Sequence, residues 1–168
     1  MMPPKLILVP IDFSDFSCKA LGVATDMASR LGAALLLVHI LPAIPDLPEG
    51  VSIFKEGAYV SELHESASKQ LSELATTLAN TNIKVRTELG TANDVGMELV
   101  RIAEHDNADM IVIATHGMTG WRRIAFGSVA QKVVEQAACP VLVLRAKVAD
   151  HSAEPQAHSS PTSAAAGK

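Results

Sequence analysis

The segment KLILVPI, residues 5–11, is a short and almost uninterrupted apolar run between Pro4 and Asp12. A strand that is buried on both faces of a sheet has this pattern. Three further runs of this kind follow along the chain, LLLVHIL at 35–41, MIVIAT at 110–115 and VLVLR at 141–145. Between the second and third of these four runs, IKVRTEL at 83–89 alternates apolar and polar residues, which suits a strand with one wetter face. The sequence therefore predicts five strands.

Helical periodicity fills the gaps between these strands. Ser14 or Asp15 can cap the first helix, and Gly32 is expected to end it. Apolar residues at three- and four-residue steps indicate the other helices. These are expected over about 59–79, over about 93–104, and from near Ser128 to the pair Cys139 and Pro140, where proline stops the helix.

Strands and helices thus alternate along the chain, and the strands are nearly continuous in apolar residues. This combination predicts an α/β fold in which a five-stranded parallel sheet has helices on both faces. Topology rules for such sheets favour the strand order 3-2-1-4-5, which places the first and fourth strands side by side at a topological switch point.

The chain is predicted to form one domain over residues 1–147, because its 168 residues suit a single core. The stretch 41–57 contains three prolines and two glycines and is expected to be a long loop, or lid, over the carboxyl ends of the strands. Residues 148–168 are small, polar and proline-containing, so we expect a disordered C-terminal tail.

The composition excludes several classes of partner. A formal net charge of -4 has the wrong sign for a protein whose main ligand is a phosphate backbone, so nucleic acid is not expected. No apolar run approaches the roughly 18–20 residues that cross a bilayer, and no signal peptide is recognised, so we expect no membrane partner and a cytoplasmic location. Cys18 and Cys139 have no close-spaced partner and are interpreted as reduced packing residues, and no metal site is predicted.

The ligand site of an open α/β sheet lies outside the carboxyl ends of its strands, at the switch point. The first strand ends in Pro10, Ile11 and Asp12. The fourth leads into ATHGMTGWRRIAFGSVAQ, which places Gly127 and Ser128 at the start of a helix. The unpaired N–H groups of a first helical turn, together with the helix dipole, attract phosphate. The sequence therefore predicts an anion site at this place.

The opening KLILVPIDFSD, the strand LLLVHIL and the region ATHGMTGWRRIAFGSVAQKVVEQAACPVLVLR resemble the universal stress protein family, nearly throughout the chain up to Arg145. Members that bind ATP carry Gly, two residues, Gly, nine residues, Gly, then Ser or Thr. Gly117, the nine residues that follow it, Gly127 and Ser128 match this pattern, and Ala114 replaces its first glycine. The resemblance implies a Rossmann-like fold of the adenine nucleotide alpha hydrolase kind.

Carried over position by position, the resemblance implies a binding site for ATP or another adenine nucleotide, such as ADP or AMP, which Mg²⁺ can accompany. Asp12 would hydrogen-bond the ribose or adenine end, with Pro10 packed nearby, and the backbone of Ile40 would meet the adenine edge. The residues that would line the phosphates are Ala114, Gly117, Gly127, Ser128 and Val129. The resemblance also implies a homodimer that pairs through the edge strand Val141–Arg145, and a role as a stress-response sensor or regulator.

Alternatives remain beside this interpretation. Asp12 can instead cap the following helix or turn, and His39, within an apolar strand, suits a hydrogen-bonded core residue better than a catalytic group. No catalytic residue is assigned, because the Walker sequence, GxSxG and GxGxxG are all absent from the sequence. Slow ATP hydrolysis is one alternative function. Another is a stress-response interaction protein that binds no nucleotide and acts through its dimer surface.

Overall fold

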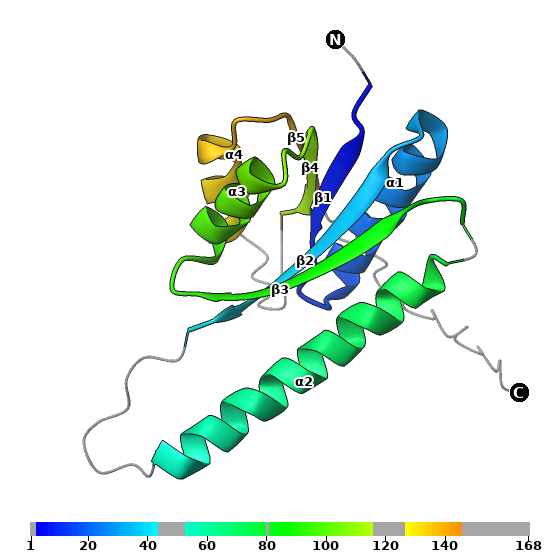
Figure 1. The fold of residues 1–168 in the computed structure, drawn as a ribbon. Helices are drawn as coiled ribbons and strands as arrows, with labels where there is room; N and C mark the ends of the chain where they lie inside the picture. Colours follow the sequence, from blue (N-terminus) through cyan, green and yellow to red (C-terminus); the bar gives the residue numbers. More distant parts are fainter. Residues whose placement is uncertain (1–2, 44–52, 80, 116–126, 146–168) are drawn as a thin grey trace, which may run out of the picture.

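The computed structural model describes residues 3–43, 53–79, 81–115 and 127–145, and in these ranges strands and helices alternate (Figure 1). The strands are β1 (Leu6–Pro10), β2 (Ala34–Pro42), β3 (Val85–Ala92), β4 (Met110–Ala114) and β5 (Val141–Leu144). The helices are α1 (Asp15–Leu31), α2 (Ile53–Thr77), α3 (Val95–His105) and α4 (Ser128–Gln136). None of the helices in these ranges has the length and apolarity needed to cross a membrane.

The five strands form one sheet in the order β3-β2-β1-β4-β5, and every neighbouring pair is parallel. The predicted fold class and strand order are therefore confirmed. At the centre of the sheet, Leu8 of β1 pairs with Leu36 of β2 on one side and with Ile111 of β4 on the other. All three side chains are at most 2% exposed, as expected for strands that are covered on both faces.

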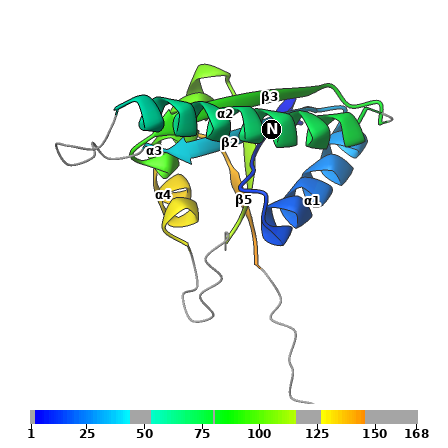
Figure 2. The same cartoon turned by 90° about the horizontal axis from the view of Figure 1, so that it is seen from below.

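Two apolar layers cover the sheet, one on each face. Figure 2 shows α1 and the α3–α4 pair on opposite sides of the sheet. Residues of α1 and α2 pack with Ile7, Val9 and Leu37, whereas α3 and α4 pack with Leu8 and Leu36. Successive strand residues thus serve opposite layers, and this is why these segments are apolar without interruption.

The ends of α1 agree with the prediction. Ser14 is the N-cap, and its side-chain oxygen accepts a hydrogen bond from the backbone N–H of Ser17. Gly32 follows the helix with φ 69°, a left-handed conformation that glycine adopts without strain, and its N–H bonds the carbonyl oxygen of Ala28.

Helix α2 differs from the prediction at its beginning. It starts at Ile53, six residues before the expected Tyr59, and β2 continues to Pro42, so the predicted loop 41–57 is too long at both ends. Residues 44–52 of the predicted loop or lid, and the predicted tail 148–168, lie outside the described residues. Among the residues of this helix whose burial is described, Ala67 and Leu71 are buried, and Leu71 packs with the strand residues of the layer that α1 and α2 form. Prolines and glycines in the sequence predicted a loop as far as Gly57, but the helix already begins at Ile53 and includes that glycine.

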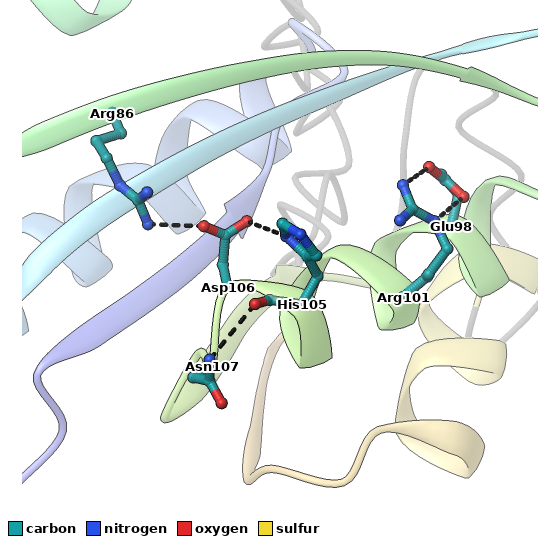
Figure 3. Close-up of polar contacts among 6 residues, drawn as sticks. All are labelled: Arg86, Glu98, Arg101, His105, Asp106 and Asn107. Atoms are coloured by element: carbon teal, nitrogen blue, oxygen red, sulfur yellow. Dashed lines mark hydrogen bonds and ion pairs between the residues drawn. The ribbon is translucent and has the colours of Figure 1, made fainter.

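The edge strand β3 also differs slightly, because it runs from Val85 to Ala92 rather than over 83–89. Its Arg86 forms an ion pair of 3.0 Å with Asp106, the residue that caps the C-terminal end of α3 (Figure 3). Within α3, the Arg101 guanidinium donates two hydrogen bonds to the Glu98 carboxylate, which holds the pKa of Glu98 below its ordinary value. The ion pair of Arg86 with Asp106 therefore ties the end of α3 to the wetter edge of the sheet, whereas the pair of Glu98 and Arg101 stabilises the helix itself.

The two cysteines differ in burial. Cys139 is half-buried beside the α3–α4 layer, and this burial raises the pKa of its thiol. Cys18 is exposed on α1, so its interpretation as a packing residue is wrong. Both thiols are free in the structure, as expected.

Candidate functional site

A cavity of about 440 Å³ opens at the carboxyl ends of β1, β2 and β4, beside the starts of α3 and α4. This is the switch point between β1 and β4, where the sequence predicts a ligand site. Seven of the eight predicted site residues line the cavity. They are Pro10, Asp12, Ile40, Ala114, Gly127, Ser128 and Val129. The eighth, Gly117, lies outside the described residues.

A polar network shapes the turn between β1 and α1. The backbone N–H and the hydroxyl of Ser14 both donate to Oδ1 of Asp12, at 3.0 and 2.6 Å. Ser17 completes the network. Its Oγ accepts a hydrogen bond from the backbone N of Asp12 at 3.4 Å, and its hydroxyl donates to the Ser14 carbonyl oxygen. Asp12 therefore supports Ser14, the residue that caps α1, and at the same time lines the cavity.

His39 reaches this turn from the neighbouring strand β2. Its ring nitrogen Nδ1 lies 2.6 Å from the carbonyl oxygen of Ile11. Its ring also packs against Phe13, with 4.5 Å between the ring centroids. The structure thus agrees with the hydrogen bond expected of His39, but the residue is half-buried and lines the cavity rather than lying in the core.

The start of α4 is held against the end of β4. The N–H of Gly127 donates to the carbonyl oxygen of Thr115 at 2.7 Å, and a Cβ on Gly127 would lie only 2.8 Å from that oxygen. Thr115 is held in turn by β5, because its N–H and its hydroxyl both donate to the carbonyl oxygen of Leu144. Glycine is therefore required at 127 by the chain's own backbone, whereas sequence reasoning assigned it to the approach of a phosphate.

The N-terminus of α4 differs from those of α1 and α3. Ser14 and Asp94 cap the latter two helices through their side chains, but Gly127 provides no side-chain cap for α4. The first turn of α4, from Ser128 to Ala130, lines the cavity. Its backbone N–H groups and the positive end of its dipole are therefore placed to meet an anion there.

Helix α3 forms a wall of the cavity that sequence reasoning did not include. Val95 and Leu99 line it, although their spacing in the sequence indicates only a buried helix face. A Cβ on Gly96 would lie 2.7 Å from Cβ of Lys132, so glycine allows α3 to approach α4 closely. Gly96 was the signal available in the sequence, since a glycine within a helix costs helix stability and usually has a reason in packing or function.

Asp94 stabilises the start of α3 in two ways. Its side chain accepts a hydrogen bond from the backbone N–H of Met97, and it forms an ion pair of 3.2 Å with Lys132 of α4. The hydrogen bond, and then the neighbouring ammonium, hold the pKa of this carboxyl below its ordinary value. Asp94 therefore links the two helices that border the cavity.

The lowered pKa of Asp94 predicts a pH dependence. A carboxyl whose pKa is lower in the folded than in the unfolded chain adds stability above its unfolded pKa, about 3.9, and this contribution is lost as the pH falls through the folded value. Asp94→Asn keeps a capping oxygen but removes the charge. We expect the variant to lose less stability than the unsubstituted protein between pH 7 and about pH 3.

Urea unfolding at a series of pH values measures this difference. Asp26→Asn, which changes an exposed aspartate on α1, is the control and should leave the pH profile of stability unchanged. Parallel profiles for the Asp94 variant and the unsubstituted protein would show that the charge of Asp94 adds nothing to the folded state.

Among the described residues, no group of three or more His, Cys, Asp or Glu side chains is arranged to hold a metal ion. The described lining of the cavity contains one carboxylate, that of Asp12. The chemistry that this arrangement supports is binding of a ligand with an apolar part and an anionic part.

Comparison with known proteins places this chain in a family. The pattern of the universal stress protein family matches residues 4–145. Universal stress protein MJ0531 of Methanocaldococcus jannaschii is 33% identical over 144 residues, which cover 84% of this chain and 82% of that protein. The solved structure of MJ0577, from the same organism, aligns with a TM-score of 0.73 at 26% identity, over 88% of this chain and 99% of the other.

A further solved structure contains a nucleotide. The universal stress protein from Archaeoglobus fulgidus in complex with dAMP aligns with a TM-score of 0.60 at 23% identity, over 85% of this chain and 98% of the other. At this level of identity the likeness concerns the fold.

Proposed function

Because the chain belongs to the universal stress protein family, we propose that it binds ATP or another adenine nucleotide in the cavity at the switch point and acts as a stress-response sensor or regulator. The observation that carries this proposal is the first turn of α4, which lines the cavity without a side-chain cap. The phosphates would accept hydrogen bonds from its N–H groups. The Archaeoglobus fulgidus protein, which has the same fold, holds dAMP.

The rest of the cavity suits the remaining parts of a nucleotide. Ile40, Val95 and Leu99 give it apolar walls against which a base can pack. At the end of β1, the carboxylate of Asp12 would accept hydrogen bonds from the ribose hydroxyls. Mg²⁺, where it accompanies the nucleotide, would be held mainly by the phosphates, because such ions use few protein carboxylates and the lining described offers one.

Binding is favoured over efficient hydrolysis by the same lining. A phosphoryl-transfer site needs a group that orients the attacking water and carboxylates that hold the metal. Asp12 is the one carboxylate of the described lining, and its Oδ1 already accepts two hydrogen bonds from Ser14. The nucleotide would therefore be sensed or retained more readily than turned over.

The proposal includes a homodimer in the cytoplasm that pairs through β5 and Arg145. β5 lies at one edge of the sheet. Neighbouring elements cover part of its four residues, but all four remain partly exposed. An edge strand leaves unpaired backbone groups that a second copy of the strand can satisfy. The same surface would serve an interaction protein that binds no nucleotide, so nucleotide binding is the property that separates the two functions.

Titration with ATP, ADP and AMP tests the proposal, using protein from which co-purified nucleotide has been removed. A ligand present at 100 times its dissociation constant stabilises the folded state by about 2.7 kcal/mol, so millimolar ATP should raise the melting temperature clearly. Calorimetry gives the dissociation constants, and inorganic triphosphate controls for binding that depends on the phosphates alone. If no nucleotide at millimolar concentration stabilises the protein, the interaction function is favoured.

A further inference from the structure

The turn that carries Asp12 has an unusual backbone conformation. Phe13, the next residue, has φ 62°, in the left-handed region that bulky residues adopt rarely. Strain of this kind persists only where surrounding contacts enforce it, and it is found most often at functional sites. Asp12 at this position lines the cavity and is half-buried. The contacts that enforce the turn therefore also decide where its carboxylate lies.

His39 makes contacts on both sides of Asp12. Its Nδ1 lies 2.6 Å from the carbonyl oxygen of Ile11, and its ring lies against Phe13 with an angle of 41° between the ring planes. A carbonyl oxygen can only accept, so Nδ1 must carry a hydrogen. Nδ1 carries a hydrogen in the neutral tautomer that is protonated at this nitrogen, and also in the imidazolium form, so either form of the ring can donate this hydrogen bond.

His39 is itself held in a rigid place. It belongs to β2, whose residue Val38 accepts a hydrogen bond from the N–H of Ile11, and it pairs with Leu89 of β3. On the other side of the turn, Ser14 holds Oδ1 of Asp12 but also caps α1. His39 thus connects the turn to the sheet independently of the helix cap, in addition to the packing of Ile11 and Phe13 on the apolar layer of α1 and α2.

We infer that His39 is a positioning residue for the ligand. By bonding the residue before Asp12 and packing on the residue after it, His39 fixes the carboxylate where it receives the ribose hydroxyls. This inference rests on the proposed function, because it assigns a role within the nucleotide site. His39 itself lines the cavity, so the inference makes a specific prediction: its effect on affinity runs through Asp12 and not through a contact of its own with the ligand.

Four variants test the inference by calorimetric titration with ATP and with 2′,3′-dideoxy-ATP, which lacks the ribose hydroxyls. His39→Leu removes the donor, whereas His39→Asn places an amide N–H where Nδ1 was. Asp12→Ala removes the carboxylate, and the double variant combines Asp12→Ala with His39→Leu. We expect His39→Leu to weaken ATP binding about tenfold, the effect of losing one well-placed polar interaction, and to leave dideoxy-ATP binding unchanged. His39→Asn should restore most of the ATP affinity, and the double variant should bind ATP as Asp12→Ala does.

Thermal unfolding of each variant shows whether it folds. If His39→Leu does not, His39→Gln replaces it, because its amide nitrogen reaches towards the position of Nε2 rather than of Nδ1. The inference is overturned if His39→Leu weakens ATP and dideoxy-ATP equally, if it leaves ATP binding unchanged, or if its effect adds fully to that of Asp12→Ala. Titration of the unsubstituted protein separates the inference about His39 from the proposed function on which it rests. If that protein does not bind ATP, the proposed function is refuted, and the role of His39 with it.

Discussion

Gly127→Val is expected to remove ATP binding and to destabilise the protein. A Cβ at this position would lie 2.8 Å from the Thr115 carbonyl oxygen, and this oxygen belongs to the backbone at the end of β4, so it cannot move aside as a flexible side chain would. The start of α4 would have to shift, and the hydrogen bond from Gly127 to Thr115 would break. We expect a loss of about 1–3 kcal/mol in the free energy of unfolding, as for other overpacked sites.

The same shift moves the N–H groups of the first turn of α4 away from the cavity, so ATP affinity should fall at least about a hundredfold. Urea unfolding and calorimetric titration measure the two effects separately. Gly22→Ala is the matched control, because no atom lies within 4 Å of a Cβ built there and alanine favours the interior of α1. ATP affinity that survives in a folded Gly127→Val protein would place the phosphates elsewhere.

Leu71→Ala should give a large loss of stability. Leu71 is 2% exposed and packs in the layer that α1 and α2 form on the sheet. Its truncation removes buried apolar surface and leaves a cavity, which costs about 2–5 kcal/mol. Since domains of this size are stable by about 5–15 kcal/mol, the loss would be a large part of the total.

Chemical unfolding at pH 7 measures this effect, and Tyr59→Ala on the same helix is its control. Tyr59 is 56% exposed, so its truncation should change stability by less than about 1 kcal/mol. The difference between the two variants reports how firmly α2 is fixed to the sheet. Similar small losses in both would mean that α2 adds little to the stability of the sheet it covers.

The sequence was sufficient for the sheet because its signals are local and repeated. Each central strand is apolar throughout, and this can be read from Ile7 to Val9 or from Ile111 to Ile113 without knowledge of their neighbours. The strand order followed from topology rules, and it placed β1 beside β4. Seven site residues could then be located together, because a parallel sheet brings the ends of its strands to one edge.

Features that depend on contacts between distant segments could not be predicted in this way. The contact of His39 with Ile11 and Phe13 joins β2 to the turn after β1, and the left-handed φ of Phe13 has no mark in the sequence. Gly127 was located correctly but explained by a ligand, because the carbonyl of Thr115 that requires it is twelve positions away along the chain. The early start of α2 was missed because Gly57, which usually disfavours a helix, lies inside it.

The bond between Gly127 and Thr115 also has a consequence for how this protein can vary. Thr115 at the end of β4 and Gly127 before α4, the two residues on either side of positions 116–126, are joined by this hydrogen bond. Loops whose ends meet can be lengthened at small entropic cost. Because Thr115 and Gly127 hold the ends of β4 and α4 together, insertions between these two positions should leave the sheet and its helices as they are.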